Sequence, residues 1–297
     1  MQISAALVKE LREQTGAGMM ECKKALQAAD GDLEQAIVHM RKAGLAKADK
    51  KSARVAAEGL IATSISEDQR HAAMVEVNSE TDFVAGNDEF RDFARAVADL
   101  ARDEAPEDAA ALLALPMPAG NGDTVEQVRG NLVIKIGENI QVRRLVHRAA
   151  AEDEVFASYV HGGRIGVLVR CTGSERAVQR DIAMHIAASN PVALDPDHVD
   201  EALVEREKEI LKAQAETSNK PPEIIEKMVQ GRLKKFFSEV TLVMQPFVKD
   251  PDVTVGDYAK RHGVAIKGFD RFVVGEGIEK KEENFAEEVM AQVRDSQ

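Results

Sequence analysis

The sequence has few of the residues that mark secreted, membrane-spanning or metal-dependent proteins. Only Cys22 and Cys171 occur among its 297 residues. Two cysteines so far apart supply neither a disulfide framework nor a metal-ligand set, and this usage fits a reducing compartment. The first turns carry charges, which excludes a signal peptide, and no later run is long and apolar enough to span a bilayer. We therefore expect a cytoplasmic protein that does not bind membranes.

Aromatic residues are also scarce, at 4% with no tryptophan, although 44% of the chain is hydrophobic. This composition predicts thin cores of Ala, Val, Leu and Met in two or three domains. The formal net charge of -12 repels phosphate backbones, so we expect no direct nucleic-acid binding. Residues 1–57 differ, with 10 Lys/Arg against 7 Asp/Glu, and could meet an acidic partner surface.

The common catalytic motifs are missing as well: GxxxxGK[ST], GxGxxG after a strand, HExxH and GxSxG do not occur. Residues 195–200 (DPDHVD) could form a metal site, but their spacing favours a cap and first turn of a helix. Cys22 and Cys171 are interpreted as core thiols, and His185 has no evident nucleophile beside it. We expect neither catalysis, cofactor nor bound metal.

Hydrophobic spacing predicts an N-terminal unit of three short helices. The apolar stripes are Leu7, Val8 and Leu11; Met19, Met20 and Leu26; and Leu33, Ile37 and Met40. Glycines interrupt the pattern at 16–18 and at 31, and Asp32 is a plausible helix cap. Because each helix is too short to be stable alone, the three should pack together. The basic residues 47–54 are interpreted as a solvated helical linker.

Two strand–strand–helix units follow, which we interpret as an internal duplication. In the first, residues 60–65 and 73–77 alternate as strands and Phe90 begins a helical stripe. In the second, the strands are 157–160 and 165–169, and the helix contains Ile182. The candidate third strands are 140–146 and 271–274.

A large insertion separates the second helix from its third strand. Residues 197–217 are charged and helical, with a sparse apolar seam, and Pro221 and Pro222 interrupt the helix before a return segment. Since proline is tolerated in a first helical turn, we expect a projecting helical hairpin with its tip near 219–221. Residues 284–294 resemble one more amphipathic helix.

The two repeats differ in the loop before their helix. The first has residues 78–90 (NSETDFVAGNDEF), whereas the second has only 171–175 (CTGSE). Phe83 could point to a partner while Asp82 meets a polar group. From the residues alone, the alternative that Phe83 fills its own core is favoured about two to one, because aromatics are usually buried. Asn87 or Asp88 should cap the helix.

Several strings resemble the bacterial translation elongation factor Ts family. They are residues 8–26 (VKELREQTGAGMMECKKAL), 58–61 (EGLI), 81–85 (TDFVA), 231–237 (GRLKKFF) and 245–250 (QPFVKD). These matches keep the order of the family's motifs and extend over nearly the whole chain.

The resemblance implies an α+β architecture of five parts. Residues 1–55 would form a ubiquitin-associated-like (UBA-like) three-helix domain, and residues 56–148 the first core subdomain of antiparallel sheet with helices. The second core subdomain would combine 149–190 with 241–280. Residues 191–240 would be an inserted coiled-coil or dimerisation hairpin, and 281–297 a C-terminal helical module.

The resemblance also implies a guanine nucleotide exchange factor whose partner is the GDP form of elongation factor Tu. In this family the TDFV loop, here Thr81, Asp82, Phe83 and Val84, is assigned to displacing Mg²⁺ from that GTPase. Family members lack hydrolytic chemistry, and the resemblance suggests that the factor stays with the aminoacyl-tRNA–elongation factor Tu–GTP complex until hydrolysis on the ribosome. A homodimer through the hairpin is left open.

Two rival functions are kept. A chaperone-like or ribosome-associated binder would hold peptide on the N-terminal helices, with affinity for unfolded chains and no effect on nucleotide release. A metal hydrolase would use residues 195–200 and would contain metal. Neither rival explains why the loop of the first repeat is longer than that of the second.

Overall fold

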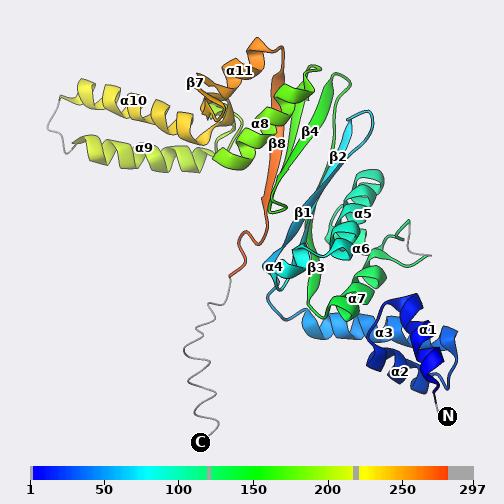
Figure 1. Cartoon of the computed structure of the whole chain (residues 1–297). Coiled ribbons are helices and arrows are strands. Elements are labelled where there is room, and N and C mark those ends of the chain that lie inside the picture. Colours follow the sequence, from blue (N-terminus) through cyan, green and yellow to red (C-terminus); the bar gives the residue numbers. More distant parts are fainter. Residues whose placement is uncertain (1–2, 119–121, 217–220, 280–297) are drawn as a thin grey trace, which may run out of the picture.

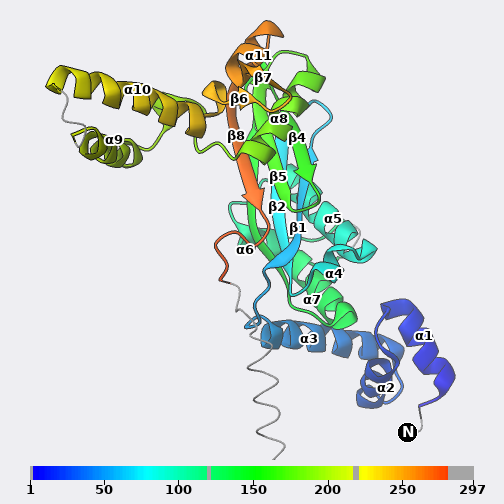
Figure 2. The same cartoon turned by 60° about the vertical axis from the view of Figure 1, so that its left-hand side comes forward.

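The computed structural model describes residues 3–118, 122–216 and 221–279 of the chain. It shows an elongated molecule, with a helical bundle at one end, two three-stranded antiparallel sheets in the middle and a helical hairpin that projects near the other end (Figure 1). The architecture is therefore α+β, as predicted. Figure 2 shows the same arrangement from a second side.

The N-terminal bundle consists of α1 (Ala5–Thr15), α2 (Met19–Ala28) and α3 (Leu33–Lys51). Its core is small-residue-rich, with Leu11, Cys22 and Leu26 fully buried. The turn after α1 requires a left-handed residue, which Gly16 supplies at φ 66°. The predicted cap at Asp32 is confirmed, since its carboxylate accepts from the Gln35 backbone N–H at 3.0 Å.

The prediction that Met19 and Met20 belong to the buried stripe of α2 is wrong. Met19 is 44% and Met20 65% exposed, while the buried face of the helix repeats through Cys22, Ala25 and Leu26. Met20 lies away from this repeat, and Met19 is in the first turn, at the end of the buried face. Two large apolar side chains of the bundle consequently face solvent.

The bundle packs against the first core unit through α3 and α7 (Val125–Ile136). Gly44 of α3 is close to α7, because a Cβ at this position would lie 2.9 Å from the Ile134 side chain and 3.3 Å from the Gly130 carbonyl oxygen. An ion pair of 3.0 Å between Arg41 and Asp123 supports this contact.

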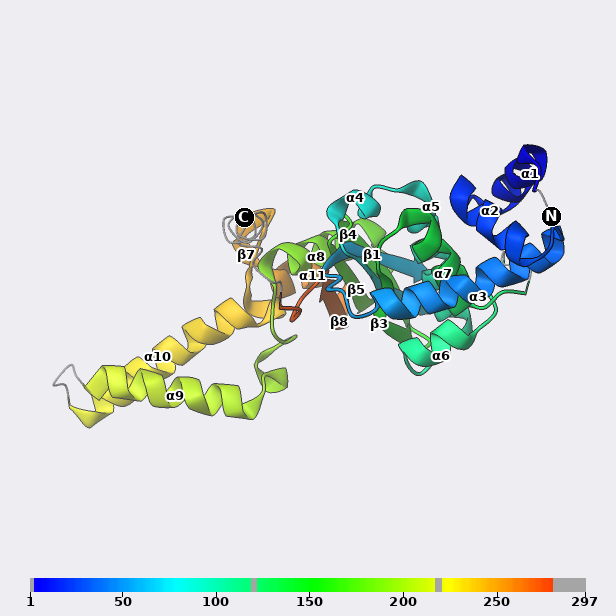
Figure 3. The ribbon, with the colours of Figure 1, turned by 90° about the horizontal axis from the view of Figure 1, so that it is seen from below.

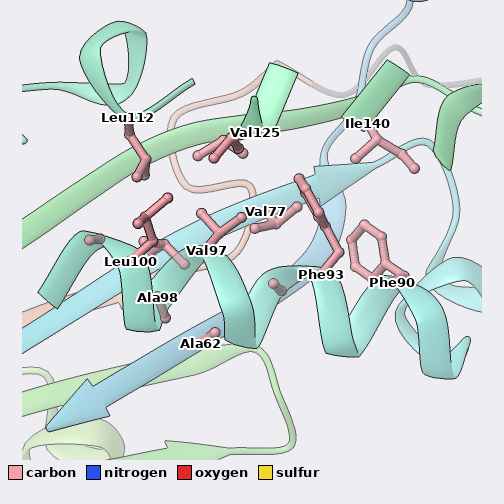
Figure 4. Close-up of a cluster of buried hydrophobic side chains, with 14 of the residues drawn as sticks. Ala62, Val77, Phe90, Phe93, Val97, Ala98, Leu100, Leu112, Val125 and Ile140 are labelled. Atoms are coloured by element: carbon pink, nitrogen blue, oxygen red, sulfur yellow. The ribbon is translucent and has the colours of Figure 1, made fainter. Parts of the chain in front are cut away.

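The first sheet has the order β1-β2-β3, all antiparallel, with β1 at Glu58–Ile65, β2 at His71–Ser79 and β3 at Ile140–Ala149. The three predicted strands are confirmed, each slightly longer than expected. Helix α5 (Asp88–Glu104) covers one face, where Phe90, Phe93 and Val97 meet the sheet (Figure 4). The short helix α6 (Ala109–Ala114) and α7 complete this core.

The second sheet has the order β4-β5-β8, with β4 at Glu154–His161, β5 at Ile165–Thr172 and β8 at Ala265–Val273. Helix α8 (Arg176–Ser189) packs on it. The topology is that of the first unit, as the duplication predicts. The third strand starts earlier than the predicted 271–274. An irregularity in its pairing with β5 at Lys267, followed by Gly268 without a side chain, conceals the alternation.

The faces that the two sheets turn toward each other form one apolar layer. Ile61, Ala72, Met74 and Val146 of the first sheet meet Phe156, Leu168 and Val274 of the second unit. Gly166 allows this close approach, because a Cβ there would lie 2.3 Å from Ile61 Cγ2 and 2.7 Å from Met74 Sδ. The Ile61 backbone N–H also donates to the Gly163 carbonyl at 2.7 Å, which fixes the β4–β5 turn beside β1.

The insertion is a hairpin of α9 (Glu201–Glu216) and α10 (Pro222–Val240), which extends away from the sheets (Figure 3). The prediction of two helices is confirmed, but the first begins later than 197, after a 3-10 turn at Pro196–His198. Asn219 and Lys220 of the predicted tip lie outside the described residues, as does the predicted tail helix at 284–294. The chain then returns to β8 through four short elements: a second 3-10 turn (Leu242–Met244), β6 (Pro246–Phe247), β7 (Asp250–Thr254) and α11 (Val255–Arg261).

Candidate functional site

The loop that leaves β2 is held at its base by two carboxylates, Glu138 after α7 and Glu80 of the loop itself. Glu138 accepts two hydrogen bonds from Thr81, from the backbone N–H at 2.9 Å and from the hydroxyl at 2.6 Å. Glu80 accepts from the Asn139 backbone N–H at 2.6 Å and lies 3.4 Å from Arg54. These reciprocal contacts join the ends of β2 and α7, so the loop starts from a fixed position.

The loop then forms a single helical turn, α4 (Asp82–Ala85), which the second repeat lacks. Val84 is buried and attaches the turn to the core. Asn87 ends the loop and caps α5, because its side-chain oxygen accepts from the Phe90 backbone N–H at 3.1 Å. Arg91 supports the turn from α5, since its Nε donates to the Ala85 carbonyl at 2.9 Å.

Phe83 points out of this turn and is 87% exposed. Asp82, beside it, is also exposed. The interpretation of Phe83 as a core residue is therefore wrong: its own fold gives it no pocket, because Val84 takes the inward position of the turn. Burying a phenylalanine is worth about 1.5–3 kcal/mol, so a side chain fixed in this position is well suited to enter another molecule.

All four residues of the predicted TDFV site thus lie in one short segment with different surroundings. Thr81 is tied to Glu138, Val84 is buried, and Asp82 and Phe83 face solvent. The sequence did not reveal Glu138 and Arg91 as supports. Glu138 is 57 residues from Thr81 in the chain, and the bond from Arg91 to Ala85 forms only because the α4 turn folds back beside α5.

Comparison with known proteins agrees with this loop and fold. The family model described as Elongation factor TS matches residues 80–276, a range that includes the Phe83 turn, β3 and the whole second sheet. The chain belongs to the elongation factor Ts family. It is 58% identical over 296 residues to Elongation factor Ts of Alkalilimnicola ehrlichii, and 57% identical over 296 residues to that of Halorhodospira halophila, with all of both chains covered in each case. Elongation factor Ts of Legionella pneumophila (strain Lens) is 55% identical, over 98% of this chain and 99% of the relative.

The residues 195–200 of this elongation factor Ts family member are explained by capping. The Asp195 carboxylate accepts from the backbone N–H groups of Asp197 and His198 at 3.0 and 3.2 Å, and Asp200 accepts from that of Leu203 at 3.1 Å. Within residues 3–118, 122–216 and 221–279, no group of three or more His, Cys, Asp and Glu side chains could hold a metal ion.

The two cysteines and His185 of this family member are core residues, as predicted. Cys22 and Cys171 are both buried, and burial raises the pKa of the Cys171 thiol to about 12. Burial lowers the pKa of His185, against the opposing effect of its 2.9 Å hydrogen bond to Gln245. Nδ1 of the same ring accepts from the Val248 backbone N–H at 3.2 Å, so the ring joins α8 to the segment that leaves β6.

No helix in the part of the chain that the structure describes has both the length and the apolarity needed to cross a membrane.

Proposed function

We propose that this chain binds the GDP form of elongation factor Tu and promotes the exchange of GDP for GTP. In this proposal the loop of Thr81, Asp82, Phe83 and Val84 displaces Mg²⁺ from the nucleotide site of that GTPase. The observation that carries the proposal is the 87% exposure of Phe83 on a turn that is anchored on both sides. Membership in the elongation factor Ts family supports the identity of the partner.

The anchored turn can transmit force to a partner, which a flexible loop cannot do. GTPases hold their nucleotide through Mg²⁺, a P-loop Ser or Thr and backbone donors around the phosphates. Phe83 acts as a wedge between the elements that flank this site, and the carboxylate of Asp82 disturbs the polar contacts beside it. Each 1.4 kcal/mol of nucleotide-binding free energy that the GTPase loses lowers its affinity for the nucleotide about tenfold.

Linkage makes the effect reciprocal, so bound nucleotide weakens the grip of the exchange factor by the same factor. The factor therefore accelerates equilibration in both directions. Net exchange of GDP for GTP is driven by an excess of GTP and by capture of the GTP form by aminoacyl-tRNA. The chain supplies no hydrolytic step of its own. Three further statements remain predictions: that the chain stays on the aminoacyl-tRNA complex until hydrolysis, that it is cytoplasmic, and that it forms a homodimer through α9 and α10.

The division into functional parts also belongs to this proposal. Residues 1–55 form the UBA-like domain, 56–148 and 149–190 with 241–280 the two core subdomains, and 191–240 the inserted hairpin. The hydrophobic clusters follow the same sequence order, one in the bundle and one on each sheet. The C-terminal module at 281–297 lies outside the described residues.

The test is release of a fluorescent GDP analogue from purified elongation factor Tu in a stopped-flow instrument. The wild-type chain should accelerate release, and Phe83→Ala should lose most of that acceleration, because Ala cannot fill the space that the wedge opens. Val192→Ala is the matched control, since Val192 is 60% exposed but lies in the segment between α8 and the hairpin.

Because Phe83 contacts solvent, its substitution should leave the melting temperature of the chain unchanged. Normal release with a correctly folded Phe83→Ala chain would remove the wedge from the proposal. A wild-type chain that binds unfolded peptides and leaves GDP release unchanged would instead favour the chaperone-like rival.

A further inference from the structure

A groove of about 660 Å³ opens beside the Phe83 turn, at the place where the two core units meet. Its floor is the backbone of β1 at residues 59–63. One wall is formed by α4 and the first turns of α5, and the other by the turn between β4 and β5. The hydrogen bond from Ile61 to Gly163 ties the wall formed by the β4–β5 turn to this floor.

The charged side chains that line this groove are mainly cationic, on a chain whose net charge is -12. Arg91, Arg95 and Arg164 line it, together with a single carboxylate, Asp82. Arg164 lies 2.5 Å from Glu58, so part of its charge is already compensated. Arg95 is the least engaged of the three: its side chain is 72% exposed and lies 3.5 Å from an equally exposed Asp92.

The groove and Phe83 must be covered by the same partner surface. Asp82 and Ala85, which line the groove, flank Phe83 in the four-residue α4. A partner that buries Phe83 therefore also removes water from the groove. Guanidinium groups that lose water without receiving an acceptor destabilise a complex, whereas paired carboxylates restore their hydrogen bonds in a bidentate geometry.

We infer that the groove receives an acidic segment of the GTPase, whose carboxylates pair with Arg95 and Arg91 when Phe83 enters the nucleotide site. This inference rests on the function proposed above, and adds to it a charge-based contact that determines affinity. Phe83 changes the state of the nucleotide site, while the arginines hold the partner in register. The occupant is thus an acidic stretch of protein.

The test is Arg95→Glu, assayed by GDP release at increasing concentrations of the full chain. Reversing one charge should raise the concentration needed for half-maximal acceleration at least tenfold, with the maximal rate changed less than twofold. This rise in the half-maximal concentration should become smaller as NaCl is raised from 50 to 300 mM, because salt screens the interaction between exposed charges. Arg206→Glu on α9 is the control, because it changes the net charge equally on the exposed surface of the hairpin.

Phe83→Ala in the same series separates the two proposals. If Phe83→Ala slows release while Arg95→Glu keeps wild-type half-saturation, the groove inference is overturned and the proposed function stands. If Phe83→Ala is normal, the proposed function itself fails. Replacing chloride by phosphate at equal ionic strength should leave the half-maximal concentration of the wild-type chain unchanged. If phosphate instead raised that concentration to the value of Arg95→Glu, the groove would be a small-anion site and the acidic-segment inference would be overturned.

Discussion

Glu76 offers the sharpest test of how the two core units are joined. This carboxylate in β2 is fully buried, yet Arg143 Nη1 is 3.1 Å and Arg144 Nε 2.5 Å from its oxygens. It also accepts from the Asn78 amide at 3.0 Å and from the Gly275 backbone N–H at 2.8 Å. Since Gly275 follows β8, a single side chain connects the first sheet to the end of the second.

Glu76→Gln should destabilise the chain strongly, because the new amide N–H₂ would face guanidinium donors. Removal of one partner from a buried ion pair costs about 3–5 kcal/mol, and we expect the lower value because Arg143 and Arg144 are about a quarter to a third exposed. For a chain of this size, about 3 kcal/mol corresponds to a melting temperature lower by roughly 6–12 °C. Urea unfolding at pH 7, followed by circular dichroism, measures the difference.

The effect should also depend on pH. Burial raises the pKa of Glu76, but the hydrogen bonds from Gly275, Asn78 and Arg144 outweigh burial and leave the pKa below its ordinary value of 4.5. A carboxylate with a depressed folded pKa stabilises the protein above its unfolded pKa, and this stability is lost as the pH falls through the folded value. The gap between wild type and Glu76→Gln should therefore be full at pH 7 and should shrink below about pH 4.

Glu205→Gln is the control, since Glu205 forms an exposed pair with Lys208 on α9 and should change stability by less than about 0.5 kcal/mol. A loss below about 1 kcal/mol for Glu76→Gln, or one that is equal at pH 7 and pH 3.5, would refute the reasoning.

Two further predictions concern the packing of the core. Gly166→Ala places a methyl group between Ile61 and Met74 and should cost about 1–3 kcal/mol, whereas Gly231→Ala, in open space on α10, should be neutral or stabilising; equal melting temperatures for both variants would contradict the packing of the sheets. In a Cys22→Ser background, Cys171 should resist a thiol reagent at pH 8 until the chain is unfolded, because its pKa of about 12 leaves almost no thiolate; rapid labelling of the folded chain would show that the thiol is accessible.

The sequence predicted the regular elements well, because local hydrophobic spacing determines them. The alternation in residues 60–65 and 73–77 corresponds to β1 and β2, and the two prolines at 221 and 222 correspond to the start of α10. Glu76 shows the limit of this approach. Alternation alone cannot reveal that β2 is covered on both faces, which buries its polar residue in an ion network with β3.

The candidate site could be predicted only in part. The longer loop of the first repeat drew attention to Asp82 and Phe83, but composition favoured burial of the aromatic ring. Its exposure follows from the single turn of α4, in which Val84 faces the core. The groove was not predictable from local patterns, since β1 and the β4–β5 turn that form it are about a hundred residues apart and meet only through sheet packing.

The most direct test of the central claim measures how GDP release from elongation factor Tu depends on Mg²⁺. Release would be followed with saturating wild-type or Phe83→Ala chain, first in millimolar Mg²⁺ and then with the metal chelated. If the loop acts by displacing Mg²⁺, the acceleration by the wild-type chain, and its advantage over Phe83→Ala, should both fall at least tenfold once the metal has been removed. An acceleration that is the same with and without Mg²⁺ would contradict the account.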